Sequence, residues 1–429
     1  MNYFGTDGIR VIADDDLNIL AYKCGYALSG AGNIVVVGRD NRPSGEQLLS
    51  YFCKGVTTAG GKVLNLGITS TPCVAYMTKQ AICDWGVMLT ASHNPEQYNG
   101  IKIFDNLGYK IAGNMERSIQ QKMCAVNYKK CISINSVNMC DEEYINYCLS
   151  VSRTSLQSIS VVVDTANGST SQLAHRAFER LLMNADYYND SLDGKINENC
   201  GCLFVENIVD KVLKKKAQLG VAFDGDGDRI IAVDNNGQVL DGDCILYCIA
   251  VYLKQHNRLP NNLVIGTHHT NMGIQNALAD KGISLLRTDV GDKYVVEKML
   301  ATFAWLGGEQ SGHIICLPST TGDGLYTALT LCKMIDNCSM PISSMCDYIL
   351  YPQCNIALDV INKDEIMHNS WLNSEIDSIR QQYQGRILVR ASGTEPKIRI
   401  MAEGSDYQQT REIADLLATK VNMVVNGGS

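Results

Sequence analysis

The chain has 429 residues, of which 37 are basic and 45 acidic, so its formal net charge is −8. With 45% hydrophobic and 19% charged residues, the composition is that of a folded chain and excludes extensive disorder. The acidic balance excludes nucleic acid or an anionic membrane surface as the main partner, and no apolar run is long enough to span a bilayer.

The seventeen cysteines are scattered along the chain without a C-x-x-C pair. This spacing does not fit a structural zinc site or a dense disulfide scaffold. The first residues also lack a basic-then-apolar signal segment. We therefore expect a cytoplasmic protein with reduced, mostly buried thiols.

Three regions repeat one pattern of a short apolar run, a polar or glycine-containing loop, and an amphipathic helix. The runs are 33–40, 159–164 and 263–266, and their helices end near Gly60, Leu182 and Asp280. Alternating strands and helices predict parallel sheets covered on both faces. The pattern therefore predicts three related α/β domains, with a further buried helix at 244–253.

The C-terminal region shows a different pattern. Strands are predicted at 355–360, 385–390 and 397–402, and helices at 371–383 and 407–421. These elements predict a distinct α+β domain. The expected domains are 1–147, 148–240, 241–350 and 351–429.

Asp224, Asp226 and Asp228 alternate with glycines between two apolar runs in the sequence DGDGDR. On a tight loop these carboxylates can converge on one hard cation such as Mg²⁺ and leave positions for a phosphate or water. An EF-hand is excluded because its sixth position requires Gly and is here Arg229. Arg229 beside the metal suits a phosphate oxygen.

The segment TASHNP places Ser92 on a loop directly after an apolar strand. The G-x-S-x-G elbow of hydrolases is missing, and His93 is a sequence neighbour that could polarise the hydroxyl. From these residues alone, an exposed nucleophile and a turn or N-cap serine both remain possible.

Three further segments have the composition of ligand-binding loops. In RASGTEP, Arg390 precedes hydroxyls and backbone N–H groups that could cradle a phosphate, although a simple glycine turn is the alternative. In GEQSGH, Glu309, Ser311 and His313 could pair with sugar hydroxyls. The N-terminal FGTDGIR is either a frayed terminus or a rigid turn on which Arg10 would suit an anion. His268 and His269 are either structural or ligand-contacting.

Together these five segments, in this order along the whole chain, resemble the α-D-phosphohexomutase superfamily, and within it the phosphoglucosamine mutase branch. Gln310, the run VGDKYV at 290–295 and the run RIMAE at 399–403 support the branch. The resemblance implies the fold predicted above, with four domains around a central active-site cleft. It also implies a cytoplasmic isomerase, monomeric or homodimeric, that acts on a small phosphosugar without nucleic acid or membrane.

The resemblance further implies a mechanism. Ser92 would carry a phosphoryl group, and Mg²⁺ would be bound by Ser92, Asp224, Asp226 and Asp228. Glucosamine 6-phosphate and glucosamine 1-phosphate would interconvert through a 1,6-bisphosphate, with a hexosamine or glucose 1,6-bisphosphate as activator. The remaining roles would fall to Lys102 or His93 as proton shuttle, Arg10 and Arg229 as charge stabilisers, Glu309, Ser311 and His313 as sugar contacts, and Arg390, Ser392, Gly393, Thr394 and Arg399 as the phosphate site.

Departures from the superfamily pattern keep other functions open. Asp289 stands where a Lys is usual, and Cys202, Leu203 and Phe204 replace a Ser-Thr-His run. The alternatives are a phosphomannomutase or phosphoglucomutase, a non-catalytic sugar-phosphate-binding paralogue, and a metal-dependent phosphatase.

Overall fold

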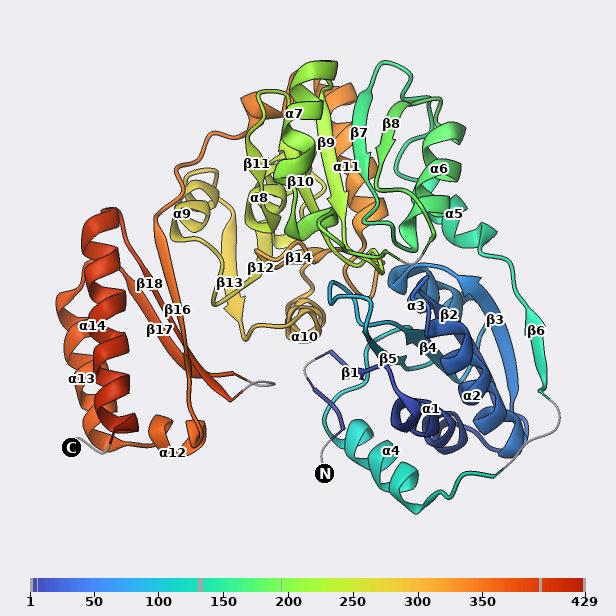
Figure 1. Ribbon diagram of the computed structural model, residues 1–429. Coiled ribbons are helices and arrows are strands. Elements are labelled where there is room, and N and C mark those ends of the chain that lie inside the picture. The colour runs from blue at the N-terminus through green and yellow to red at the C-terminus, as the bar shows by residue number, and fades with distance from the viewer. Residues whose placement is uncertain (1–2, 6, 130–133, 194, 393–395, 427–429) are drawn as a thin grey trace. The chain divides into compact units, whose positions relative to one another are not determined.

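A computed structural model describes residues 3–5, 7–129, 134–193, 195–392 and 396–426. The chain divides into two compact units (Figure 1). The first comprises Met1–Thr267 and Ile283–Cys346, and the second comprises His268–Gly282 and Asp347–Ser429. Within the described ranges, no helix combines the length and apolarity needed to cross a lipid bilayer.

The first sheet has six strands in the order β1-β5-β4-β2-β3-β6. Strands β4, β2, β3 and β6 are parallel to one another, whereas β5 is antiparallel to both of its neighbours, β4 and β1. The strands are β1 (Ile9–Ile12), β2 (Ile34–Arg39), β3 (Lys62–Ile68), β4 (Trp85–Leu89), β5 (Tyr98–Phe104) and β6 (Ser136–Asn138), with helices α1 (Asp15–Leu28), α2 (Gly45–Thr58), α3 (Thr71–Gln80), α4 (Asn114–Ala125) and α5 (Glu142–Leu149).

Alternation along β2 explains why helices cover both faces of this sheet. Val35 and Val37 belong to the core formed with α1, α2 and α4, and the pleat turns Gly38 to the opposite face, where Val74 of α3 approaches it. Helix α2 buries Leu48, Phe52 and Val56, which recur at the four-residue spacing of one helix face.

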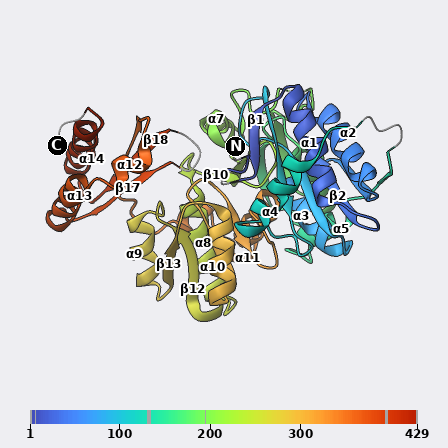
Figure 2. The ribbon, with the colours of Figure 1, turned by 90° about the horizontal axis from the view of Figure 1, so that it is seen from below.

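The second sheet has the order β11-β10-β9-β7-β8, and the third has the order β13-β12-β14-β15. Figure 2 shows α10 running alongside β12, and Val295 and Met299 of this helix pack against Ile265. The elements of the second sheet are β7 (Ser160–Asp164), β8 (Asn184–Tyr188), β9 (Leu219–Phe223), β10 (Ile230–Asp234), β11 (Val239–Leu240), α6 (Thr170–Arg180), η1 (Gly201–Leu203) and α7 (Glu206–Lys215). Those of the third are β12 (Leu263–Thr267), β13 (Ser284–Thr288), β14 (Leu306–Gly308), β15 (Ile314–Cys316), α8 (Gly242–Gln255), η2 (Pro260–Asn262), α10 (Asp292–Thr302), α11 (Gly324–Cys338) and η3 (Ile342–Met345).

One strand order recurs in the three sheets, as the repeated sequence pattern predicts: β3-β2-β4-β5, β8-β7-β9-β10 and β13-β12-β14-β15. The prediction of purely parallel sheets is wrong, because the last strand of each set is antiparallel to its neighbour. The connections before these strands are too short for a parallel crossover, so the chain returns as a hairpin. Each hairpin loop carries one motif: Ser92, Asp224–Asp228, or Glu309–His313.

The second unit is built on an antiparallel sheet with the order β16-β18-β17. Figure 1 shows α13 and α14 along one face of this sheet, where Leu372, Ile400 and Leu417 share a core. The RASGTEP segment lies between β17 and β18 in the sequence. The elements are β16 (Gln353–Asp359), β17 (Arg386–Ala391), β18 (Lys397–Glu403), α9 (Met272–Asp280), α12 (Lys363–Met367), α13 (Ser370–Gln382) and α14 (Tyr407–Val425).

Candidate active site

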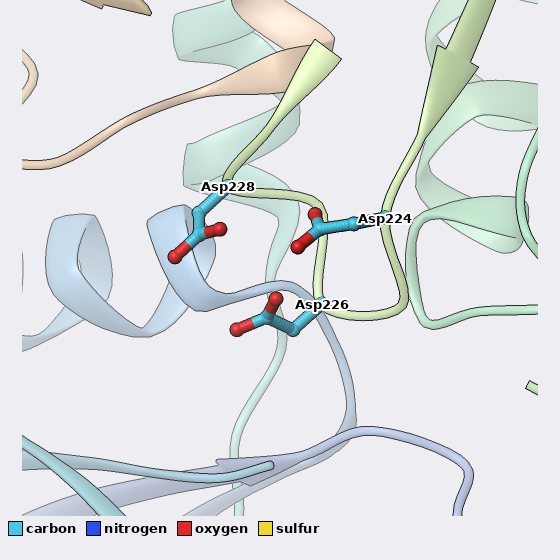
Figure 3. A group of neighbouring side chains, drawn as sticks. All are labelled: Asp224, Asp226 and Asp228. Carbon is cyan, nitrogen blue, oxygen red and sulfur yellow. The ribbon is translucent and has the colours of Figure 1, made fainter. Parts of the chain in front are cut away.

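The metal loop, defined as Asp224–Asp228, joins β9 to β10. Its three aspartates are fully buried, and one carboxylate oxygen from each lies within 4.8 Å of the others. Figure 3 shows the carboxylates turned toward one another. Gly227 has a φ of +71°, so it provides the left-handed backbone that this turn requires.

The donor set of the metal loop fits a hard divalent cation. Asp226 Oδ1 is buried, and among the described residues it has no hydrogen-bond partner. A buried carboxylate oxygen in this state is open to a metal ion, and carboxylate oxygens are the ligands that Mg²⁺ takes in proteins. Burial, reinforced by Asp226 and Asp228, raises the pKa of Asp224 to about 7. A bound cation would relieve this crowding of negative charge.

Lys102 on β5 reaches the metal loop from the first sheet. Its Nζ lies 2.7 Å from Asp226 Oδ2 and 2.6 Å from Asp228 Oδ2. Burial by itself lowers the pKa of Lys102, but the carboxylates of Asp226 and Asp228 outweigh burial and raise it well above the ordinary value. Lys102 is therefore an ammonium group that neutralises part of the metal loop.

The serine loop, defined as residues 90–97 between β4 and β5, holds Ser92 against the metal loop. Ser92 is fully buried, and its Oγ donates a hydrogen bond of 2.7 Å to Asp224 Oδ2. Its φ of +54° lies in the left-handed region, a strained conformation that persists where the surrounding structure imposes it. Its N–H donates to Thr90 Oγ1 at 2.8 Å. The loop thus aims the hydroxyl at the triad of carboxylates.

Arg42 holds the serine loop from behind. Its side chain is buried beneath the loop, and its Nε donates to Asp40 Oδ2 at 2.9 Å. The other guanidinium nitrogens all donate to backbone carbonyls of the hairpin. The acceptors are Ser92 O at 2.8 Å, Asn94 O at 2.7 Å, Pro95 O at 2.5 Å and Tyr98 O at 2.9 Å. One buried cation therefore fixes the path of the loop.

The third hairpin loop meets the metal loop through His313. Its Nε2 lies 3.1 Å from Asp228 Oδ1, and its Nδ1 lies 3.0 Å from Glu309 Oε2. Burial lowers the pKa of His313, but Asp228 and the hydrogen bond to Glu309 raise it to about 10. Arg229 Nε lies 3.3 Å from His313 Nε2 and 4.0 Å from Asp224 Oδ2. The third sheet thus supplies a further cation beside the carboxylates.

His93 and Arg10 lie at the edge of this cluster. His93 Nδ1 is 3.4 Å from Ser92 Oγ. Burial, followed by Arg229 and Arg10, lowers the pKa of His93 to about 3, so the ring is neutral at physiological pH. Arg10 forms an ion pair with Asp7.

The second unit has a cavity of about 250 Å³ on the face of its sheet opposite the helices. Arg390 and Arg399 line this cavity together with His269 and Asn355, and the two arginines are cross-strand partners. Two guanidinium groups side by side on one sheet face offer several N–H donors to an anion. Ser392, which follows β17, is buried.

The first unit brings together most of the predicted site residues that it contains: Ser92, His93, Lys102, the three aspartates, Arg229, Glu309 and His313, with Arg10 nearby. The Ser311 side chain is exposed at its loop. Arg390, Ser392 and Arg399 belong to the second unit, and Gly393 and Thr394 lie outside the described residues. Sequence reasoning missed Arg42 and Lys110. The polar residues 39–42 directly follow a buried strand, and this pattern could have indicated a functional role for Arg42.

Comparisons with known proteins agree with this architecture. Profiles of the phosphoglucomutase/phosphomannomutase family match along the chain: alpha/beta/alpha domain I over residues 1–129, domain II over 142–237, domain III over 241–351 and the C-terminal domain over 376–420. A solved phosphoglucomutase/phosphomannomutase family protein from Burkholderia thailandensis superposes with a TM-score of 0.82 at 23% identity, covering 100% of this chain and 98% of the other. The N-acetylphosphoglucosamine mutase of Aspergillus fumigatus in complex with GlcNAc-6P and magnesium gives a TM-score of 0.72 at 16% identity, covering 100% and 96%. These two structures support the fold.

Curated sequences are closer. The phosphoglucosamine mutase of Caldanaerobacter subterraneus is 39% identical over 98% of this chain and 99% of its own length. That of Clostridioides difficile is 38% identical over 98% of both. With this identity over nearly the whole length, and with all four domain models matched along the chain, the chain belongs to the phosphoglucosamine mutase family.

Proposed function

We propose that this chain interconverts glucosamine 6-phosphate and glucosamine 1-phosphate through a phosphorylated Ser92 and a 1,6-bisphosphate intermediate. Family membership makes it an isomerase that acts on phosphosugars, and its curated relatives bear the name phosphoglucosamine mutase. The observation that carries the proposal is the buried Ser92 Oγ, 2.7 Å from Asp224 Oδ2 of the carboxylate triad. A hydroxyl in this position can both receive and return a phosphoryl group.

The reaction would consist of two phosphoryl transfers of opposite direction. In the first, the bond between phosphorus and Ser92 Oγ breaks as a bond forms from phosphorus to O1 of the 6-phosphosugar. After the sugar reorients, the 6-phosphoryl group passes back to Ser92 and leaves the 1-phosphate. Lys102 would give a proton to Ser92 Oγ as it leaves and take the proton of the attacking sugar hydroxyl.

Charge neutralisation supplies most of the catalysis in such transfers. A Mg²⁺ ion held by Asp224, Asp226 and Asp228 would offset charge on the transferring phosphoryl group. Arg229 and Arg10 would add positive charge on the protein side. The buried position of Ser92 would limit hydrolysis by water.

The cavity on the second unit would hold the phosphate that is not reacting. Arg390 and Arg399 offer two guanidinium groups on one sheet face, which is the chemistry that recognises a phosphate. Glu309, Ser311 and His313 are proposed to contact the sugar. A hexosamine or glucose 1,6-bisphosphate would phosphorylate Ser92 before the first turnover.

We also propose that the enzyme works in the cytoplasm as a monomer or homodimer. The sixteen described cysteines lie outside any disulfide, which is typical of a reducing compartment. Size-exclusion chromatography with light scattering will give the oligomeric state.

Intact mass spectrometry tests the phosphoserine. After incubation with glucose 1,6-bisphosphate, the protein should carry a single phosphoryl increment. Ser92→Ala should lose it, and Ser118→Ala, a substitution on the exposed side of α4, should retain it. A protein that never acquires the increment would contradict the mechanism. A coupled assay with glucosamine, glucose and mannose 6-phosphates tests the substrate, and a preference for either of the latter two would assign another phosphohexose.

A further inference from the structure

Lys110 is a buried ammonium group surrounded by carboxylates from three parts of the first unit. Its Nζ lies 2.6 Å from Asp7 Oδ1, 2.7 Å from Asp292 Oδ2 and 3.8 Å from Asp228 Oδ2. Its side chain is only 8% exposed. These three aspartates belong to the N-terminal segment, the start of α10 and the metal loop.

A rigid turn delivers Lys110 to this position. Asp105 Oδ1 accepts the N–H groups of Leu107 and Tyr109, each at 2.9 Å. Gly108 has a φ of +81°, and a Cβ there would overlap the backbone oxygen of Ala75. Lys110 then pairs with Phe104 in an antiparallel bridge. The direction of its side chain is therefore set by the backbone.

Asp7 connects Lys110 to the catalytic cluster. One Asp7 oxygen faces Lys110, and the other lies 3.2 Å from Lys102 Nζ. Arg10 pairs with this second oxygen as well. Asp7 is thus shared by three cations, two of which are proposed to act on the phosphosugar.

Asp292 anchors the other side of Lys110. It is the first residue of α10, and Thr321 Oγ1 donates to its Oδ2 at 3.0 Å. Nearby, Thr320 Oγ1 donates to Gly108 O at 2.5 Å. The start of α10 and the loop after β15 therefore hold both the turn that carries Lys110 and the ammonium group itself.

We propose that Lys110 is a positioning residue for the mutase reaction, because it neutralises Asp7 and Asp292 and thereby keeps the Lys102 ammonium between Asp7 and the metal loop. Without Lys110, two buried carboxylates lose their partner, and an uncompensated buried charge is costly. Asp7 would then draw Lys102 toward itself and away from Asp226 and Asp228. Lys110 itself does not act on the reacting atoms. The inference rests on the proposed function.

The test compares Lys110→Met with Lys110→Arg and with a neighbouring lysine. Lys110→Met keeps the length of the side chain and removes its charge. We expect kcat to fall about 10- to 100-fold, the range seen when residues that orient active groups are replaced, while KM for the phosphosugar changes less than about threefold. Lys110→Arg retains the cation and should recover most of kcat.

Lys293→Met is the matched control. Lys293 follows Asp292 in sequence, has an 11% exposed side chain, and pairs with Glu116 at 3.6 Å. It lines the same cavity as Lys110 and Asp292, but among the described residues its ion pair is with Glu116 rather than with Asp7 or the metal loop. The kcat of the Lys293→Met variant should stay within about threefold of the wild type, because Lys293 is a nearby charge without a role in positioning.

Combining Lys110→Met with Asp292→Asn keeps the proposal testable if the single variant folds poorly. The double variant removes one cation together with one of its carboxylates, so it should fold, and its kcat should be no lower than that of Lys110→Met. The inference is overturned if Lys110→Met has wild-type kcat, if Lys293→Met loses as much, or if Lys110→Arg restores nothing. An inactive wild type would instead contradict the proposed function.

Discussion

The serine loop and the metal loop occupy the same place in two sheets that share one strand order, yet they are stabilised in opposite ways. The serine loop places a left-handed backbone on Ser92, which has a side chain, and a buried cation, Arg42, binds its carbonyls. The metal loop places its left-handed backbone on Gly227 and concentrates negative charge that Lys102 offsets from the neighbouring sheet. The repeated scaffold fixes where a functional loop lies, and a few residues decide what it does.

Disrupting the charge of the metal loop should have the largest effect. Asp226→Asn, or removal of divalent cations by a chelator, should lower kcat about 10³-fold, since a metal contributes several kcal/mol to such transition states. Added Mg²⁺ should restore the chelated wild type. Steady-state kinetics measure this, with Asp186→Asn as a surface control in the same sheet. Full activity without divalent cations would contradict the proposed role of the loop.

Removing the cation behind the serine loop should have the next largest effect. Arg42→Met leaves Asp40 and several loop carbonyls buried without their donor, and we expect the free energy of unfolding to fall by about 3–5 kcal/mol. Urea denaturation measures this.

Arg39→Met is the control for Arg42. Arg39 Nη1 donates one bond of 3.1 Å to Asp40 O, so its replacement should cost about 1 kcal/mol. Equal losses for the two arginines would show that the loop does not depend on Arg42.

The left-handed positions of the two loops, Ser92 and Gly227, should respond to substitution in opposite directions. Ser92→Gly removes the strain and should stabilise the fold by about 1 kcal/mol, while it abolishes phosphorylation. Gly227→Ala should destabilise the fold by more than that, because the new Cβ would meet the Thr170 hydroxyl at a positive φ. Thermal unfolding measures both, and a destabilised Ser92→Gly would show that the Ser92 hydrogen bonds outweigh its strain.

The smallest effect concerns His93 beside the serine. Its pKa is lowered to about 3 from an ordinary 6.5, so the unfolded chain binds this proton between those values and the folded chain does not. His93 therefore contributes stability that is fully present above pH 6.5 and is lost as the pH falls toward 3. In this pH window the slope of the free energy of unfolding against pH reports how many more protons the unfolded chain binds. His93→Gln should reduce that number by up to about one. If His93→Gln has the same slope as the wild type, the His93 ring is charged in the folded protein in this window and the lowered pKa is wrong.

Local sequence patterns predicted the elements, because burial and periodicity are encoded over a few residues. In the C-terminal region, strands were predicted at 385–390 and 397–402, and β17 and β18 confirm them. The antiparallel return of each last strand was missed, although the few residues between Leu89 and Tyr98 exclude a crossover helix.

Contacts between distant residues were not predictable in this way. Lys110 and Asp292 are far apart in sequence, and no periodicity pairs them. Likewise α9 follows β12 along the chain, but Asn271 at its start donates to Tyr351 O at 2.9 Å, a partner that only tertiary structure reveals. The roles of the motifs came from family resemblance, whereas the residues that support them became visible only in three dimensions.

The two lysines that face the metal loop lie in a different predicted domain from its three aspartates. The three aspartates lie in the predicted domain 148–240, whereas Lys102 and Lys110 lie in 1–147. Expressed alone, the second domain would keep three crowded carboxylates and lose both ammonium groups that face them, so its loop would have to rearrange or take up protons and cations from solution. Co-expressed halves that include both domains would retain the pairing. The smallest autonomous piece of the catalytic centre is therefore larger than one repeat of the sheet.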